Sequence, residues 1–493
     1  MSEDASVNAD AVWWPDADSA YLAVRRMQTK LHRWAGEDSS RRFDDLFNLV
    51  YDPAFLVHAW ERVAANAGAR TPGVDRATVT RIEARVGVEE FLGQLRDTLK
   101  GREFRPVEVR QVMIPKAGGK LRSLGIPTVA DRVVQASLKA VLEPIFEADF
   151  KSCSYGFRPN RRAHDAIAEI HHLASNPINY HWVLEADIHA CFDEIDHTAL
   201  MDRLRARIKD KRVNALVRAF LASGVMTTTG DREQTLTGVP QGGILSPLLA
   251  NIALSTLDEH FDQQWQGPMG TGSKRTVRTR KGLGNWRLIR YADDFVLMVS
   301  GQRHHAEALR AEVADVLTPL GLRLSPEKTR VVHIDEGFDF LGFHIRRQRK
   351  RGTQKYVVYT TPSKKAVQAI KDKVTAKTNR STTHMSAAEL LVSLNRTLSG
   401  WANYFRHGVS KATFGAIDHH AWGRITRWIF RKHSRINWRQ LRRRFCRPGT
   451  WKIAHDGVTF TGASSVRVRR YRYRGNTIAT PWTSTPATTP VAA

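Results

Sequence analysis

Two adjacent carboxylates, Asp293 and Asp294, are the residues whose placement most directly suggests chemistry. They lie between two apolar runs, 288–289 and 295–299. Side chains alternate along a strand, so neighbouring carboxylates approach one point only at a turn. The pattern therefore predicts two short strands over 288–300 with the carboxylates at the tip between them. An Asp-rich surface turn is the alternative, because aspartate tolerates turn geometry.

A third carboxylate, Asp187, lies near the end of an apolar stretch, 182–188, which is typical of a buried strand. Across a sheet it could meet the hairpin pair. Converging carboxylates hold two divalent ions about 4 Å apart in enzymes that transfer phosphoryl groups. Hard oxygen ligands favour Mg²⁺, one ion activating a 3′-hydroxyl and the other stabilising the leaving pyrophosphate. Asp193 and Asp196, farther on, are expected to cap a turn and a helix instead.

The elements that must position these carboxylates mix helix and strand over the first 350 residues. We expect helices at 21–34, 129–146, 198–208, 245–261 and 305–317. Strands are expected at 106–115, 121–126, 182–188, 330–333 and 340–345, besides the hairpin. Residues 266–286, rich in Gly, Lys and Arg, are predicted to form a mobile basic loop.

The pattern changes after about residue 350. Residues 363–445 are almost wholly helical in pattern and strongly basic, and 449–482 are predicted to be β-rich, with a short strand at Val466–Arg474. The last dozen residues, rich in Thr, Pro and Ala, are expected to be disordered.

Arginines recur in this second half at spacings suited to a nucleic acid. Four fall near one helical face, opposite apolar residues, and such a stripe can follow a phosphate backbone; they are Arg424, Arg427, Arg431 and Arg435. Arg442 and Arg443 extend the stripe. Farther on, Arg469, Arg470 and Arg472 alternate with tyrosines, a mixture suited to stacking and phosphate contact. A merely solvated basic face is the alternative.

Composition supports a polyanionic partner. The chain has 493 residues, enough for two to four domains, and its 76 Lys+Arg exceed its 49 Asp+Glu by 27. A generically basic surface is the alternative. The three cysteines are far apart, which argues against a disulfide framework or a zinc finger. No secretory signal and no run of some 18 apolar residues is present, so we expect a cytosolic protein without membrane partners.

The ordered motifs around the carboxylates are similar to those of reverse transcriptases, and their wider wording resembles the group II intron-encoded reverse transcriptase/maturases. The motifs are Pro72–Asp75, Ile114-Pro115-Lys116, Leu124–Thr128, Asp131–Gln135, Ser154–Pro159, Ala186-Asp187-Ile188, Pro240–Pro247, Tyr291–Asp294 and Phe340–Phe343. The helical block resembles the maturase (X) domain, also the polymerase thumb, through Leu394–Arg396 and Gly400–Phe405. The likeness covers roughly residues 40–480.

The resemblance implies a fold and a division of the chain. The fold class is α/β (α+β): a right-hand polymerase with fingers and palm around a mainly antiparallel sheet, then an α-helical thumb and a small basic C-terminal region. The expected parts are an N-terminal leader (1–40), fingers and palm (41–350), maturase domain or thumb (351–445), a DNA-binding-like basic region (446–480) and a disordered tail (481–493).

It also implies roles for single residues. Asp187, Asp293 and Asp294, with the backbone carbonyl of Ile188, match the ligands of two Mg²⁺ ions. Four residues match the nucleotide site: Lys116 and Arg122 hold the triphosphate, Gln241 lies beside nucleotide and template, and Phe192 crowds the sugar 2′ position. Solvated hairpin charges and a core phenylalanine are the plainer alternatives. The family's usual Gly-Thr-Pro-Gln here reads Gly238-Val239-Pro240-Gln241, a mild departure.

The function so implied is RNA-directed DNA polymerisation that copies intron RNA, with splicing assistance by binding the intron, supporting retrohoming. Implied partners are group II intron RNA, RNA template and DNA primer, target DNA and deoxynucleoside triphosphates, in the bacterial cytosol near the nucleoid; a homodimer stays open. Lacking downstream Cys pairs, the chain is expected to have no His-Asn-His nuclease. The alternatives are a CRISPR-associated, diversity-generating or defence reverse transcriptase, or an RNA-binding splicing cofactor without polymerase activity.

Overall fold

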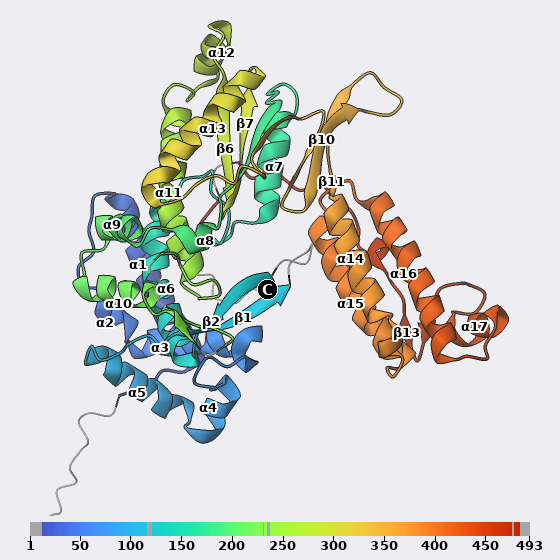
Figure 1. Cartoon of the computed structure of the whole chain (residues 1–493), viewed down its shortest axis with the longest axis horizontal. Helices are drawn as coiled ribbons and strands as arrows, with labels where there is room; N and C mark the ends of the chain where they lie inside the picture. Colours follow the sequence, from blue (N-terminus) through green and yellow to red (C-terminus); the bar gives the residue numbers. More distant parts are fainter. Residues whose placement is uncertain (1–11, 116–120, 230, 234–236, 476–477, 484–493) are drawn as a thin grey trace, which may run out of the picture.

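An antiparallel four-stranded sheet, here called the palm sheet, lies at the centre of the larger part of the molecule (Figure 1). The computed structural model describes residues 12–115, 121–229, 231–233, 237–475 and 478–483. The strand order is β6-β7-β3-β8, and each neighbouring pair is antiparallel. The strands are β3 (Trp182–Asp187), β6 (Asn285–Tyr291), β7 (Asp294–Ser300) and β8 (Arg330–His333), close to the predicted ranges.

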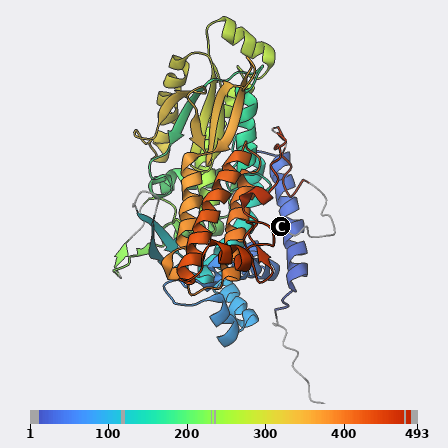
Figure 2. The same ribbon diagram turned by 90° about the vertical axis from the view of Figure 1, so that its right-hand side faces the viewer.

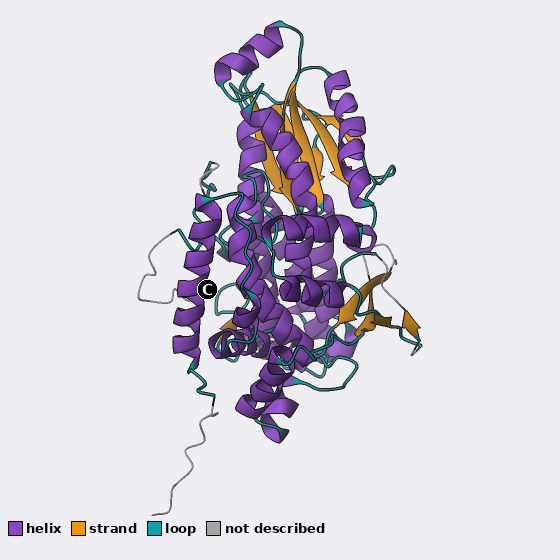
Figure 3. Ribbon diagram, turned by 90° about the vertical axis from the view of Figure 1, so that its left-hand side faces the viewer, coloured by secondary structure: helices purple, strands orange, loops and turns teal. Residues whose placement is uncertain are grey.

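Both faces of the palm sheet contribute to a core, which explains the apolar runs in β3 and β7. Leu184 and Leu297 point into one core with α6 (Val129–Asp149), α11 (Ser246–Gln266) and α13 (Arg303–Leu317). Val183 and Met298, one position along each strand, belong to a second core with α7 (Ala163–Ala174). Figure 3 shows the strands of this sheet between their covering helices.

Five helices of the N-terminal region complete the first core; the first three pack against α6, the fifth packs against the third, and the fourth against the fifth. They are α1 (Ala17–Glu37), α2 (Phe47–Val50), α3 (Pro53–Ala64), α4 (Val79–Arg85) and α5 (Val88–Lys100). The helix predicted at 21–34 is longer than expected. Its buried residues Ala20, Val24, Leu31 and Ala35 recur at helical spacing, so α1 is an integral part of the core rather than a loose leader.

The predicted strands at 106–115 and 121–126 form an antiparallel pair, β1 (Val109–Pro115) and β2 (Leu121–Ile126). Two short strands widen this sheet: β4 (Val225–Met226) runs parallel to β1, and β5 (Arg232–Glu233) pairs with β4. Two residues are too few to show a strand pattern in a sequence. Along the chain, β3 and β4 are separated by α8 (Cys191–Glu194), α9 (His197–Arg207) and α10 (Lys211–Leu221).

The predicted mobile loop at 266–286 is wrong, because it contains a helix, α12 (Gly272–Arg280). The Thr271 side chain caps it by accepting a hydrogen bond from the Lys274 backbone N–H at 3.2 Å. None of its described residues is buried, so no apolar periodicity marks it in the sequence.

The maturase-like half begins with a three-stranded antiparallel sheet of order β11-β10-β9, followed by helices (Figure 2). The boundary expected at residue 350 falls in the turn between β10 and β11. The Tyr404 hydroxyl donates to the Leu341 carbonyl at 2.9 Å, and a continuous core joins this half to α7. The elements are β9 (Phe338–Phe340), β10 (Phe343–Arg349), β11 (Tyr356–Pro362), α14 (Lys364–Lys377), α15 (Ala387–Phe405), α16 (Lys411–Lys432) and α17 (Trp438–Phe445).

The β-rich region expected at 449–482 reduces, in the described residues, to the two-residue strands β12 (Ala454–His455) and β13 (Val458–Thr459). The predicted strand at 466–474 is wrong: this segment pairs with no described strand. Instead its tyrosines contact α7. The Tyr471 hydroxyl donates to Asp165 at 3.0 Å, and the Tyr473 ring stacks on His172 with centroids 4.6 Å apart.

The chain then reaches α1, where the indole N–H of Trp482 donates to Gln28 at 3.1 Å. We call residues 466–475 and 478–483 the C-terminal strap. It connects the maturase-like half, where the Arg469 backbone N–H donates to the Arg406 carbonyl at 3.0 Å, with α7 and α1. The disordered tail predicted at the C-terminus lies, from residue 484, outside the described residues. No helix in the described parts of the chain is long and apolar enough to cross a membrane.

Replacing the strap's anchor, Trp482→Ala, is expected to release the end of the strap, because the ring is buried and its loss costs about 3 kcal/mol of local docking. Hydrogen–deuterium exchange should rise in strap and α1 peptides while the palm sheet stays protected. The matched control is Trp13→Ala, since Trp13 is 75% exposed. Unchanged exchange in the strap of the Trp482 variant would show that other contacts hold it.

Candidate active site

Strand pairing brings the three predicted carboxylates together. Asp187 ends β3 and is the direct cross-strand partner of Asp294, which begins β7. Tyr291 pairs with Asp294 across the hairpin, leaving Ala292 and Asp293 as a two-residue turn. Directly opposed residues lie about 5 Å apart, so the backbone alone places all three carboxylates at one edge of the sheet.

The hairpin turn is held by Arg290, whose side chain is completely buried. Its guanidinium donates to Asp258 at 2.7 Å, to Asn251 at 3.0 Å and to the Ala292 carbonyl at 2.8 Å. Ala292 has a φ of 58°, which a residue with a Cβ adopts at a cost of about 1 kcal/mol. The guanidinium therefore stabilises a turn that the local sequence alone would disfavour.

Gly156, in the predicted 154–159 motif, lies directly beneath this turn. A Cβ added there would lie 2.8 Å from the Tyr291 carbonyl carbon and closer still to Ala292. The Asn251 side chain donates to the Gly156 carbonyl at 2.9 Å. Only glycine allows the motif to pack this closely against the carboxylate turn.

The carboxylates repel one another. Desolvation by the surrounding protein, followed by repulsion from Asp293 and Asp187, raises the pKa of Asp294 to about 6. Desolvation, and to a smaller extent Asp187, also raises the pKa of Asp293. The ammonium of Lys328 lies 2.6 Å from Asp187, and this hydrogen bond raises the pKa of Lys328. The site thus attracts cations, and a side-chain cation already contacts it.

The donor set fits divalent ions, but its side chains are not arranged around one. Within the described residues, no three His, Cys, Asp or Glu side chains converge as a ready ligand group. Asp187 instead binds Lys328, which a metal would displace. The Ile188–Leu324 bridge uses the Asp187 carbonyl and the His189 N–H, so it does not engage the Ile188 carbonyl predicted as a ligand.

A hydrogen-bonded chain joins the β1–β2 hairpin to this edge. Arg122 on β2 donates to the Gln241 side-chain carbonyl at 2.8 Å, and the Gln241 amide donates to both oxygens of Asp193 at 2.9 Å. The Gly125 backbone N–H donates to the Gln241 carbonyl at 2.7 Å. Two of the four predicted nucleotide-site residues, Arg122 and Gln241, are therefore in contact, while Lys116 lies outside the described residues.

Comparison with known proteins identifies the family of this chain. Residues 114–345 match the family described as reverse transcriptase (RNA-dependent DNA polymerase), and residues 367–446 match the maturase-specific domain of group II introns. Protein YkfC of Escherichia coli strain K12 is 38% identical over 366 residues, which cover 70% of this chain and 94% of that protein. The chain belongs to the group II intron reverse transcriptase/maturase family.

Other relatives are longer or more distant. The group II intron-encoded protein LtrA of Lactococcus lactis is 30% identical over 371 residues, covering 65% of this chain and 60% of LtrA. Among solved structures, telomerase from Candida albicans in complex with a fragment of telomeric RNA covers 73% of this chain at 13% identity. Its TM-score of 0.39 is too low to support a conclusion.

Phe192 of this reverse transcriptase lies in α8, which follows Asp187 and the end of β3. It is half-buried against the first core, and the Val239 backbone N–H donates to its carbonyl at 2.6 Å. The 238–241 motif therefore packs over the 192–195 segment. The side chain packs against the first core, and the exposed part of the ring could still contact a nucleotide sugar.

The arginine stripe predicted on the maturase domain is broken. Arg424 donates to the Thr378 hydroxyl of α14 at 3.0 Å, so it packs helix against helix. Helix α16 ends at Lys432, so Arg435 does not share its face. Arg427 and Arg431 remain exposed one turn apart on α16. The other predicted arginines are also exposed: Arg435 beyond the end of α16, Arg442 and Arg443 on α17, and Arg469, Arg470 and Arg472 on the strap.

The strap tyrosines predicted to stack on a nucleic acid are instead used within the protein. Tyr471 and Tyr473 pack on His164 and His172 of α7, while Arg472 between them is exposed. Extended chain alternates its side chains whether or not it pairs in a sheet, so sequence alone does not reveal which side is covered.

Three residues that matter at the site were missed in the sequence: Arg290, Asp258 and Lys328. Arg290 interrupts the apolar run 288–299, and Asp258 lies in the apolar stretch of α11; a charge within a core-forming segment is a readable signal of a buried pair. Lys328 lies in a polar loop and carries no such signal. Only the backbone contact of that loop, Ser325 N–H to the Asp187 carbonyl at 2.8 Å, brings it to the site.

Removing one repelling charge, Asp294→Asn, is expected to stabilise the metal-free protein by about 1 kcal/mol at pH 7.5, a value reduced for the exposure of this side chain. The folded-state pKa of about 6 exceeds the ordinary 3.8. Folding therefore favours the protonated acid, and the wild type loses stability as the pH rises through 6. Urea unfolding in EDTA should show the variant's advantage shrinking as the pH falls from 7 to 4.

The control is Asp315→Asn, an exposed carboxylate on α13, which should leave unfolding unchanged at both pH values. An Asp294 variant that is less stable than the wild type at pH 7.5 would contradict repulsion as the dominant effect.

Proposed function

We propose that this enzyme copies intron RNA into DNA with two Mg²⁺ ions held by Asp187, Asp293 and Asp294 together with the Ile188 carbonyl. The observation that carries the proposal is the pairing of Asp187 with Asp294 beside the Asp293 turn. When bound, the ions would activate a primer 3′-hydroxyl and neutralise the leaving pyrophosphate. In a right-hand polymerase, the β1–β2 sheet then forms the fingers, the palm sheet the palm, and the maturase helices the thumb.

The chain's own residues would bind and orient the nucleotide. Arg122, exposed on the fingers hairpin, would bind the triphosphate together with Lys116. Gln241, held between Arg122 and Asp193, would contact the base pair, and Phe192 would exclude a 2′-hydroxyl. Lys328 must leave Asp187 when metal arrives, and its ammonium would then remain beside the phosphates.

The second part of the proposal is splicing assistance by binding of the group II intron RNA. The exposed arginines of α16, α17 and the strap face solvent on the maturase half, and a positive surface of this kind contacts phosphates. Primer, template, target DNA and deoxynucleotides complete the set of partners, which the bacterial cytosol and nucleoid would supply. Retrohoming follows from the two activities together.

The double substitution Asp293→Ala with Asp294→Ala is expected to abolish cDNA synthesis, since metal charge stabilisation is worth several kcal/mol, or roughly a thousandfold or more in rate. Primer extension on an RNA template with Mg²⁺ measures this loss, and filter binding should show nearly unchanged RNA affinity. Asp315→Ala is the matched control. Full extension by the double variant would refute the assignment of the metal site.

Neutralising the exposed pair on α16, Arg427→Gln with Arg431→Gln, is expected to weaken intron RNA binding and to lower the salt dependence of log K by about 2. Titrations at several salt concentrations measure this slope, and a splicing assay measures its consequence. The control, Arg303→Gln with Arg310→Gln, removes the same charge from one exposed helix face of α13. Equal losses in both variants would assign the effect to net charge rather than to the thumb.

A further inference from the structure

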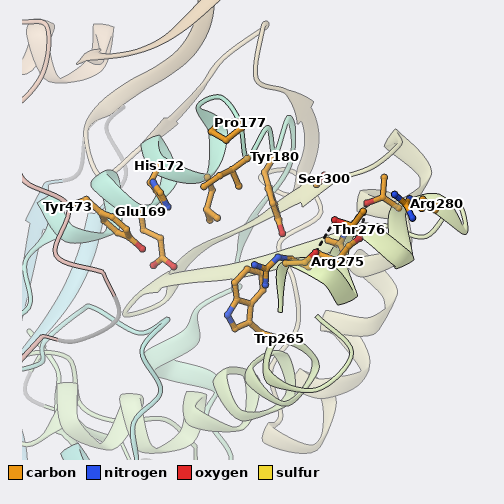
Figure 4. Close-up of a pocket in the computed structure, with 15 residues that line it drawn as sticks. Glu169, His172, Pro177, Tyr180, Trp265, Arg275, Thr276, Arg280, Ser300 and Tyr473 are labelled. Carbon is orange, nitrogen blue, oxygen red and sulfur yellow. Dashed lines mark hydrogen bonds between the residues drawn. The ribbon is translucent and has the colours of Figure 1, made fainter. Parts of the chain in front are cut away.

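A pocket of about 550 Å³ opens at the end of the palm sheet that lies away from the carboxylates (Figure 4). It is lined by α7 and the loop after it, the end of α11, α12, the first residue of β6, the last of β7, and Tyr473 of the strap. Ser300 in its lining is six residues along β7 from Asp294, a distance of about 20 Å. The pocket is therefore separate from the polymerase site.

Two buried polar atoms in the pocket lining have no hydrogen-bond partner in the described structure: the Tyr180 hydroxyl and the side-chain carbonyl of Asn285. These side chains are only 3% and 2% exposed. The Asn285 amide is already used, donating to the Arg275 carbonyl at 3.2 Å and to Thr279 at 3.1 Å. Unpaired buried polar groups are costly and rare, so two in one pocket indicate a partner that the protein itself does not supply.

The two groups are complementary to a nucleobase edge. Burial raises the pKa of Tyr180 to about 12, so its hydroxyl keeps its proton and can donate, while the Asn285 carbonyl can only accept. In Figure 4 the Tyr180 hydroxyl points toward Trp265 and Arg275. A base edge carries both acceptors and donors, so a nucleobase offers the kind of partner that each of the two atoms lacks.

The walls are aromatic and the mouth is cationic. Trp265 lies between the guanidinium groups of Arg275 and Arg287, at 5.0 and 4.9 Å from its ring centroid, and Arg280 is exposed at the rim. The charge of Glu169 in the lining is balanced by Arg287 at 3.0 Å. On the far side, Tyr473 stacks on His172. Flat rings with arginines beside them are what binds a base and its phosphate.

We propose that this pocket binds one phosphorylated nucleoside, with the base edge on Tyr180 and Asn285 and the phosphate on Arg275 and Arg280. Its volume lies within the range of about 300–1,000 Å³ found for small-ligand sites. The nucleotide is either free or one nucleotide turned out of a bound RNA chain. This site does not depend on the proposed polymerase chemistry.

The first test is calorimetry on the full-length protein, freed of nucleic acid, with AMP, GMP, CMP and UMP in EDTA, which excludes metal-dependent binding at the carboxylates. We expect saturable binding of at least one nucleotide. Arg275→Gln with Arg280→Gln should weaken it tenfold or more. The control, Lys274→Gln with Lys281→Gln, removes the same charge from the same part of the chain, but neither lysine lines the pocket. Equal weakening by both pairs would overturn the proposal.

A second variant, Tyr180→Phe, separates a ligand contact from a structural role. Loss of the unpaired hydroxyl should raise the melting temperature of the ligand-free protein and lower nucleotide affinity about fivefold. A variant that binds the nucleotide as well as the wild type, or that is merely less stable, would contradict the assignment of the base edge.

The source of the nucleotide is distinguished with structured RNA containing 4-thiouridine. Crosslinks to pocket peptides that free nucleotide suppresses identify a nucleotide of bound RNA; saturable nucleotide binding without such crosslinks identifies a free nucleotide. If neither crosslinks nor calorimetric binding is observed, the pocket is filled only by water and the proposal is refuted. Primer extension by the pocket variants is expected to persist, so failure of the polymerase proposal remains a separate result.

Discussion

The buried ion pair of Arg290 with Asp258 is the interaction on which the position of the Asp293–Asp294 turn depends. A guanidinium removed from water is tolerated only when its donors find acceptors, and here they reach α11, the 154–156 loop and the Ala292 carbonyl. One side chain thereby fixes the turn that presents Asp293 and Asp294. Burying this charge costs stability, but the buried guanidinium gives the two carboxylates a defined position.

That position has a cost in stability. The three carboxylates at the ends of these strands repel one another, but the backbone hydrogen bonds between β3 and β7 keep them close together. Lys328 supplies a partial counter-charge from a flexible, exposed side chain, which can leave when a stronger cation arrives. A buried lysine, or an arginine whose guanidinium formed hydrogen bonds with two protein groups, would be harder for a metal ion to displace from Asp187. The carboxylate repulsion thus strains the site, and a bound cation would relieve this strain.

What the sequence predicts follows from which physical signals are local. The palm strands were predictable because residues on both of their faces are buried. The carboxylates were predictable because the motifs around them occur in the order found in reverse transcriptases. Helix α12 was not, since a helix without a buried face has no apolar period. The strap was misjudged because extended chain looks alike whether it contacts a strand or a helix. The prediction that Arg424 and Arg435 share one exposed helix face was wrong for a third reason. Where a helix ends and which of its residues contact another helix are set by the tertiary structure.

The strap also changes how the two halves of the molecule should be considered. Tyr473 contacts α7 and lines the distal pocket, while Trp482 binds α1, so one extended segment connects the maturase half, the palm and the N-terminal helices. A ligand that packs against Tyr473 would stabilise the docked strap by the part of its binding free energy that depends on this contact, and a docked strap in turn completes the pocket. Ligand binding in this pocket and docking of the strap on α7 are therefore thermodynamically linked.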